Sequence, residues 1–143
     1  MYIVSGCLLG INCKYNGGNN KSEKVISFLE GKEYVVVCPE SCGKLPTPRI
    51  PAERIGDLVL NKEGKDVTKE FFDGAKLSYD FALKVALEKD EEIEGAILKF
   101  GSPSCGKGKI YDGTFSNQLV DGNGVFADIL LEQGIKAITE KEL

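Results

Sequence analysis

Three cysteines stand where strand-like apolar runs end or glycine-rich turns begin, in a chain with five cysteines and no histidine. They are Cys7, Cys38 and Cys105. The absence of histidine excludes a Cys–His catalytic pair and any histidine metal ligand. Thiols, carboxylates, hydroxyls, phenols and lysine amines must therefore supply any acid–base, nucleophilic or metal chemistry.

Short apolar runs alternate with helical patterns along the chain. Strands are predicted at Tyr2–Ser5, Tyr34–Val37, Leu58–Leu60, Ala96–Leu98 and Ile135–Thr139. Helices are predicted from Ser22 to Leu29, from Asp66 to the charged segment Glu88–Glu92, and over Val125–Gln133. We therefore predict an α/β fold with a mainly parallel, Rossmann-like sheet flanked by helices, in a single domain spanning residues 1–143.

The carboxyl ends of parallel strands share one edge of a sheet, so the three cysteines are predicted to converge there. Three thiolates without histidine suit a 4Fe-4S cluster. One iron would then lack a protein ligand and act as a Lewis acid open to substrate. Zinc is the competing metal, although Cys38 and Cys42 only weakly resemble a zinc knuckle.

Polar residues near these turns are the other candidates. Glu40 follows Cys38 by two positions and is the predicted acid or base. Ser102 and Ser104 have hydroxyls that could hold a substrate carbonyl or a water molecule. Arg49, on the stiff proline-rich segment 45–51, and Lys99 are predicted to bind an anionic group of the substrate.

Each of these residues also has an ordinary structural interpretation. A free cysteine after a strand is often buried core, and we favour a filling or peripheral role for Cys13 and Cys42. The rings of Tyr15, Tyr111 and Phe115 could stack on a planar base, but core packing is the favoured interpretation.

Composition limits the classes of function. A formal net charge of -4 and a pI near 5.0 argue against general DNA or other nucleic-acid binding. No apolar run approaches the roughly 18 residues that cross a membrane, and the first residues do not resemble a signal peptide. An odd cysteine count fits reduced thiols, so we expect a cytoplasmic protein.

Seven ordered motifs together resemble the domain of unknown function family DUF523, over nearly the whole chain. They are Val4–Gly10, Cys13–Gly17, Cys38–Glu40, Leu45–Arg49, Asp66–Thr68, Ser102–Gly106 and Ile110–Phe115. The chain departs from the family pattern at Ser41-Cys42, where many relatives have Gly-Gly after the Cys-Pro-Glu turn. This departure leaves open whether Cys42 approaches the cofactor.

The resemblance implies a compact α/β fold and the activity of the thiouracil desulfidases. These enzymes replace C=S by C=O in 2-thiouracil or in thiolated uridine of nucleosides and RNA, without net redox change. Their 4Fe-4S cluster is held by three cysteines, which match Cys7, Cys38 and Cys105. Their acid–base glutamate matches Glu40, and their active-site serine matches Ser102 in preference to Ser104.

Two alternatives belong to other classes of protein. In the first, the thiols carry persulfide or zinc for a partner, and the chain is a non-catalytic binding module. In the second, the chain is a redox-sensing domain in which Cys38 and Cys42 form a reversible disulfide.

Overall fold

A four-stranded parallel sheet forms the centre of the molecule, with strand order β2-β1-β5-β8. The computed structural model describes residues 1–143. The strands of this sheet are β1 (Tyr2–Ser5), β2 (Tyr34–Val37), β5 (Gly95–Leu98) and β8 (Ala137–Thr139). Each of the four was predicted from its apolar run, and the α/β fold with a parallel sheet is confirmed.

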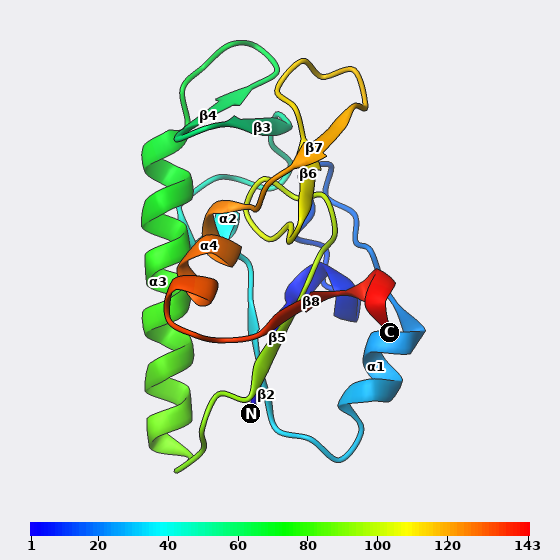
Figure 1. The fold of residues 1–143 in the computed structure, drawn as a ribbon, viewed down its shortest axis with the longest axis vertical. Coiled ribbons are helices and arrows are strands. Elements are labelled where there is room, and N and C mark those ends of the chain that lie inside the picture. The colour runs from blue at the N-terminus through cyan, green and yellow to red at the C-terminus, as the bar shows by residue number, and fades with distance from the viewer.

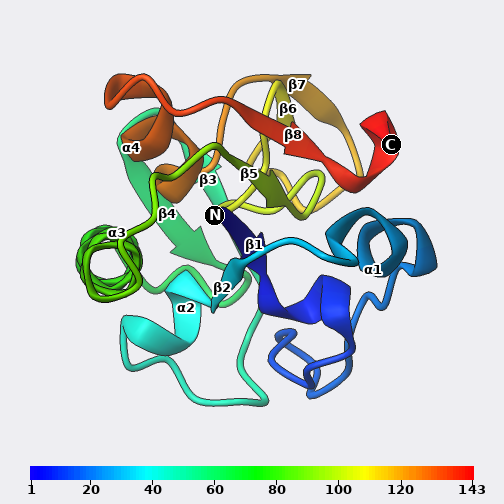
Figure 2. The ribbon, with the colours of Figure 1, turned by 90° about the horizontal axis from the view of Figure 1, so that it is seen from below.

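Helices cover both faces of this sheet (Figure 2). The helix α1 (Glu23–Leu29) lies on one face, and α3 (Thr68–Glu88) and α4 (Val125–Glu132) lie on the other. Side chains of β1 alternate between the two layers, because Ile3 packs in the α3–α4 core and Val4 packs in the α1 core.

The predicted helix boundaries have visible causes. The hydroxyl of Ser22 accepts a hydrogen bond from the Val25 amide at 3.3 Å and so caps α1. Gly134, which follows the last turn of α4, has a φ of 77°, which glycine adopts without steric cost. Short turns follow the two neighbouring strands: η1 (Gly6–Leu9) after β1, and α2 (Pro39–Cys42) after β2.

Two antiparallel hairpins lie beyond the carboxyl ends of the sheet strands (Figure 1). One pairs β3 (Ala52–Ile55) with β4 (Leu58–Asn61), and the other pairs β6 (Lys109–Tyr111) with β7 (Leu119–Asp121). The chain ends in the turn η2 (Glu140–Glu142). The strand β3 was not predicted. None of the helices combines the length and the apolar composition that crossing a bilayer requires.

Close packing at Gly74 joins α2 to α3. A β-carbon added at Gly74 would lie 1.9 Å from the Pro39 carbonyl oxygen and 2.7 Å from the Gly43 amide nitrogen. The backbones of the two helices therefore meet directly at this point. This contact fixes α2, which carries Glu40.

We expect Gly74→Ala to destabilise the protein. Steric overlap costs about 1–3 kcal/mol in a packed interior, more than the roughly 1 kcal/mol that alanine gains over glycine in a helix. The matched control is Ser78→Ala on the same helix, because the Ser78 hydroxyl is buried without a hydrogen-bond partner. Urea unfolding should show a lower midpoint for Gly74→Ala and an unchanged or higher midpoint for Ser78→Ala. An unchanged midpoint for Gly74→Ala would contradict this packing.

Candidate functional site

A cavity of about 430 Å³ lies at the carboxyl-terminal edge of the sheet. Cys7 enters it from the turn after β1, Cys38 from the end of β2, and Cys105 from the loop after β5. The structure therefore brings together the three cysteines that the sequence analysis selected. All five cysteines of the chain are free thiols.

Burial dominates the electrostatics of two of these thiols. Burial raises the pKa of Cys105 to about 12, and its side chain is only 4% exposed. Burial also raises the pKa of Cys7, while a hydrogen bond with Asn20 and the charge of Lys99 act in the opposite direction. The surroundings of Cys7 and Cys105 thus favour the neutral form of both thiols.

Cys13 also lines the cavity, which corrects the filling or peripheral role predicted for it. Its sulfur lies over the start of η1, 3.4 Å from the position of a β-carbon on Gly6. A hydrogen bond with the Cys13 thiol lowers the pKa of Cys38 to about 6. Cys13 lies in the loop after Cys7, and the many glycines and asparagines of that loop were the one sequence feature that indicated a place at the site. Cys42, by contrast, does not line the cavity.

No three His, Cys, Asp or Glu side chains are grouped closely enough to hold one metal ion. Zinc sites need thiolates about 2.3 Å from a single centre, so this arrangement does not favour the zinc alternative.

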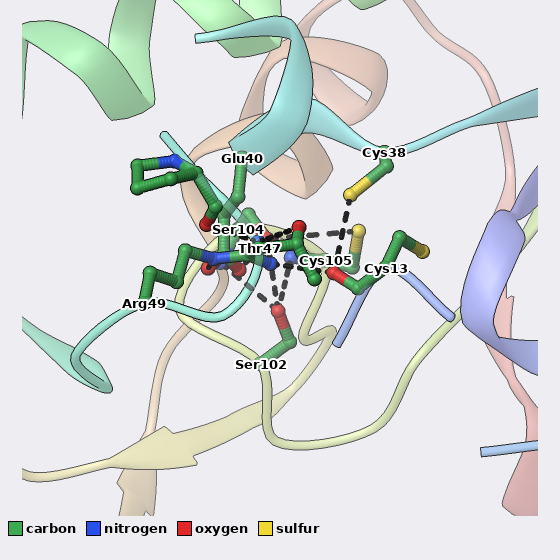
Figure 3. Close-up of polar contacts among 9 residues, drawn as sticks. Cys13, Cys38, Glu40, Thr47, Arg49, Ser102, Ser104 and Cys105 are labelled. Carbon is green, nitrogen blue, oxygen red and sulfur yellow. Dashed lines mark hydrogen bonds and ion pairs between the residues drawn. The ribbon is translucent and has the colours of Figure 1, made fainter. Parts of the chain in front are cut away.

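Glu40 points into the same cavity from α2 and is held by Arg49. The Arg49 Nε donates to Glu40 Oε1 at 2.9 Å, and the two side chains are only 6% and 16% exposed respectively. The remaining guanidinium nitrogens donate to the Thr47 hydroxyl and to the carbonyls of Pro46 and Cys13 (Figure 3). Arg49 was predicted to bind an anionic group of the substrate, but the anion that it contacts in the structure is the Glu40 carboxylate of the protein itself.

The loop after β5, which carries Ser102 and Ser104, contacts the other oxygen of the Glu40 carboxylate. The Ser104 hydroxyl donates to Glu40 Oε2 at 2.9 Å, and the Ser102 and Ser104 hydroxyls lie 2.9 Å apart (Figure 3). Because Ser104 gives its proton to the carboxylate, Ser102 donates to Ser104. The amides of Ser104 and Cys105 donate to the Ser102 oxygen. Ser104 is 2% exposed, so its hydroxyl serves Glu40, whereas Ser102 is half-buried at the cavity wall.

Lys99 lines the cavity beside Cys7. Its amine donates to the Phe100 carbonyl at 3.0 Å and forms an ion pair with Glu140 at 3.1 Å. The turn η2 at the end of the chain thus anchors this cation at the edge of the site.

Arg49→Met tests the support of Glu40. It leaves a mostly buried carboxylate without its cation, which costs about 3–5 kcal/mol of unfolding free energy. We expect turnover per folded molecule to fall by roughly tenfold or more, because Glu40 loses its fixed orientation. The control is Arg54→Met, which breaks the ion pair with Asp128 outside the cavity. The test fails if both variants lose stability but keep the same turnover per folded molecule.

The rings of Tyr15, Tyr111 and Phe115 all line the cavity, and none belongs to either apolar core. Core packing, the favoured interpretation from sequence, is therefore wrong for these rings. The reason is topological. The cores fill the two faces of the sheet, whereas Tyr15 and Phe115 lie on loops and Tyr111 on the hairpin strand β6, all beyond the edge of the sheet.

Comparisons with known proteins agree with this geometry. A family model described as 2-thiouracil desulfurase matches residues 2–142. The uncharacterized protein YbbK of Bacillus subtilis (strain 168) is 44% identical over 147 residues, covering 100% of this chain and 97% of YbbK. A solved structure of the 4Fe-4S-dependent thiouracil desulfidase TudS superposes with a TM-score of 0.85 at 42% identity, covering 99% of this chain and 91% of that one.

Proposed function

Because the chain belongs to the 2-thiouracil desulfurase family, we propose that it is a desulfidase that converts the C=S group of a thiolated pyrimidine to C=O. Water supplies the oxygen, and the sulfur leaves as hydrosulfide, so no electrons are exchanged. The observation that carries the proposal is the Glu40 carboxylate, oriented by Arg49 and Ser104 in the cavity that also holds the thiols of Cys7, Cys38 and Cys105.

The cofactor of the proposal is a 4Fe-4S cluster, on which the structural relative TudS depends. Cys7, Cys38 and Cys105 would hold it. The donor set fits, because it is all thiol and reaches one cavity from the turns and loops that follow three neighbouring strands. When bound through three cysteines, the cluster supplies one open iron as a Lewis acid for the thiocarbonyl sulfur.

The other steps of the proposed reaction are assigned to side chains that line the cavity. Glu40 takes one proton of the attacking water and returns it to the leaving sulfur, and the second proton of that water passes to solvent as the C=O bond forms. Arg49 and Ser104 keep the carboxylate oriented. When substrate is bound, the Ser102 hydroxyl donates from the cavity wall to the ring or to the oxygen that forms at the reacting carbon, in place of its hydrogen bond to Ser104.

Lys99 is the cation proposed to meet an anionic group of the substrate, whereas Arg49, whose guanidinium nitrogens all donate to protein oxygens, acts through Glu40. Their ion pairs with Glu140 and Glu40 fix both side chains at the cavity. The substrate class is a thiopyrimidine, either as the free base or as thiolated uridine in a nucleoside or in RNA. Reduced thiols and an oxygen-sensitive cluster fit the cytoplasm as the site of this reaction.

Anaerobic purification followed by iron and sulfide analysis tests the proposal. We expect about four irons per chain. The loaded protein is then incubated with 2-thiouracil, 4-thiouracil and 2-thiouridine, and uracil or uridine is measured together with hydrosulfide. Iron-loaded protein that releases no hydrosulfide from any of the three would favour the carrier function instead.

A further inference from the structure

The loop between β6 and β7, residues 112–118, contributes the ring of Phe115 to the cavity wall. This ring is half-buried but packs in neither apolar core. It stacks on no other aromatic ring and carries no cation. An aromatic side chain offers a large apolar face, so the face that Phe115 presents to the cavity is available to a planar ligand.

The backbone of Phe115 is held in an unfavourable conformation. Its φ is 57°, in the left-handed region, where residues with a β-carbon are uncommon. Asn117, which also lines the cavity, has a φ of 61°. Conformations of this kind persist where the surroundings impose them, and they concentrate at ligand sites.

Glu53 of β3 imposes this conformation. Its Oε1 accepts the amide of Gly113 at 2.9 Å and the amide of Phe115 at 3.1 Å. A β-carbon on Gly113 would lie 2.2 Å from Ile55 Cγ1, so the loop rests directly on the neighbouring hairpin. One carboxylate oxygen therefore joins the two hairpins and fixes the position of Phe115.

We propose that Phe115 is the surface on which the pyrimidine ring of the substrate stacks, and that Glu53 is the residue that positions it. This inference rests on the proposed function, because it requires a flat heterocyclic substrate. Stacking is indifferent to the position of the sulfur on the ring, since every pyrimidine has a π face. It holds the ring while Glu40 and Ser102 act on the reacting carbon.

Phe115→Trp tests the contact by fluorescence, because the chain has no tryptophan. Titration of the iron-loaded variant with uracil, the product, should give a saturable change in emission as the ring stacks on the new indole. Tyr34→Trp is the control. It places the single tryptophan at the exposed start of β2, outside the cavity, and should show only the non-saturable absorption of added ligand.

Kinetics of conservative variants separate stacking from mere structure. Phe115→Leu keeps apolar bulk without a flat face and should raise KM for 2-thiouracil about tenfold. Its kcat should stay within about threefold, because the ring does not act on the reacting carbon. Phe115→Tyr keeps the face and should behave as the parent protein. Glu53→Ala should match Phe115→Leu, whereas Glu53→Gln retains an acceptor oxygen and should restore KM.

The outcomes distinguish this inference from the proposed function. Turnover of 2-thiouracil without a saturable signal from Phe115→Trp, or with unchanged KM in Phe115→Leu, overturns the stacking role alone. Saturable uracil binding without turnover by the parent protein overturns the proposed function and retains the stacking role. If neither uracil binding nor turnover is observed, both the stacking role and the proposed function are overturned. Equal KM values for Glu53→Gln and Glu53→Ala overturn the positioning role of Glu53.

Discussion

Cys7→Ala, Cys38→Ala and Cys105→Ala are each expected to lose the bound iron and all desulfidase activity. Each thiol enters the cavity from the turn or loop after a different strand, so the loss of one removes the protein ligand from one side of the cluster. A cluster held by only two thiolates has lost a third of its protein ligands and is open to solvent. Iron content and the visible absorbance of anaerobically prepared protein should fall to background together with hydrosulfide release.

Cys42→Ala is the matched control, because Cys42 lies on α2 close to Cys38 in sequence but outside the cavity. It should keep iron and activity. Circular dichroism verifies folding, above all for Cys105→Ala, since Cys105 packs in the larger core. If one of the three variants folds and keeps its full iron content, the cysteine that it replaces is not a ligand of the cluster. Cys13→Ala measures in the same assay what the fourth thiol of the cavity contributes.

Glu40→Gln is expected to keep the cluster and lose turnover. Glutamine preserves the shape of the side chain and can still accept from Arg49, so the cavity should remain intact. It cannot take a proton from water. Loss of a general base lowers kcat by about 10²–10⁴-fold. Iron content, measured on the same preparation, should match that of the parent protein. The thermal midpoint should fall, because the buried Arg49 guanidinium loses its counterion.

Glu33→Gln is the control for this substitution. Glu33 lies immediately before β2, at the opposite end of the strand from Glu40, and forms an exposed ion pair with Lys89. Its turnover should be unchanged. Turnover of Glu40→Gln within about threefold of the parent would exclude Glu40 as the base and would direct attention to Ser102. If the parent protein and Glu40→Gln carry the same amount of sulfur or metal and neither turns over substrate, the result would instead support the carrier function.

Local sequence patterns determined the parallel sheet and most helix boundaries. Runs such as Tyr34–Val37 and the capping residue Ser22 act through neighbouring residues, so they are readable without tertiary information. The strand β3 was missed because two of its four residues, Glu53 and Arg54, are charged. The two-residue turn Gly56-Asp57 between Ile55 and Leu58 was its available signature.

The amino-acid sequence by itself also determined that Cys7, Cys38 and Cys105 meet, because parallel strands place their carboxyl ends at one edge. Only the tertiary structure decided the partners of Glu40. Its contact with Ser104 joins residues 64 positions apart, on the short helix α2 and on the loop after β5, whose positions depend on long-range packing.

The same holds for the walls of the cavity. Cys13 and Phe115 stand on loops without periodic pattern, so their sequence neighbours do not fix their orientation. Hydrogen bonds from distant elements fix it instead, as when Glu53 of β3 accepts the Phe115 amide. Strand ends follow from backbone topology, which local patterns encode, whereas loop side chains take their places only after the whole chain has packed.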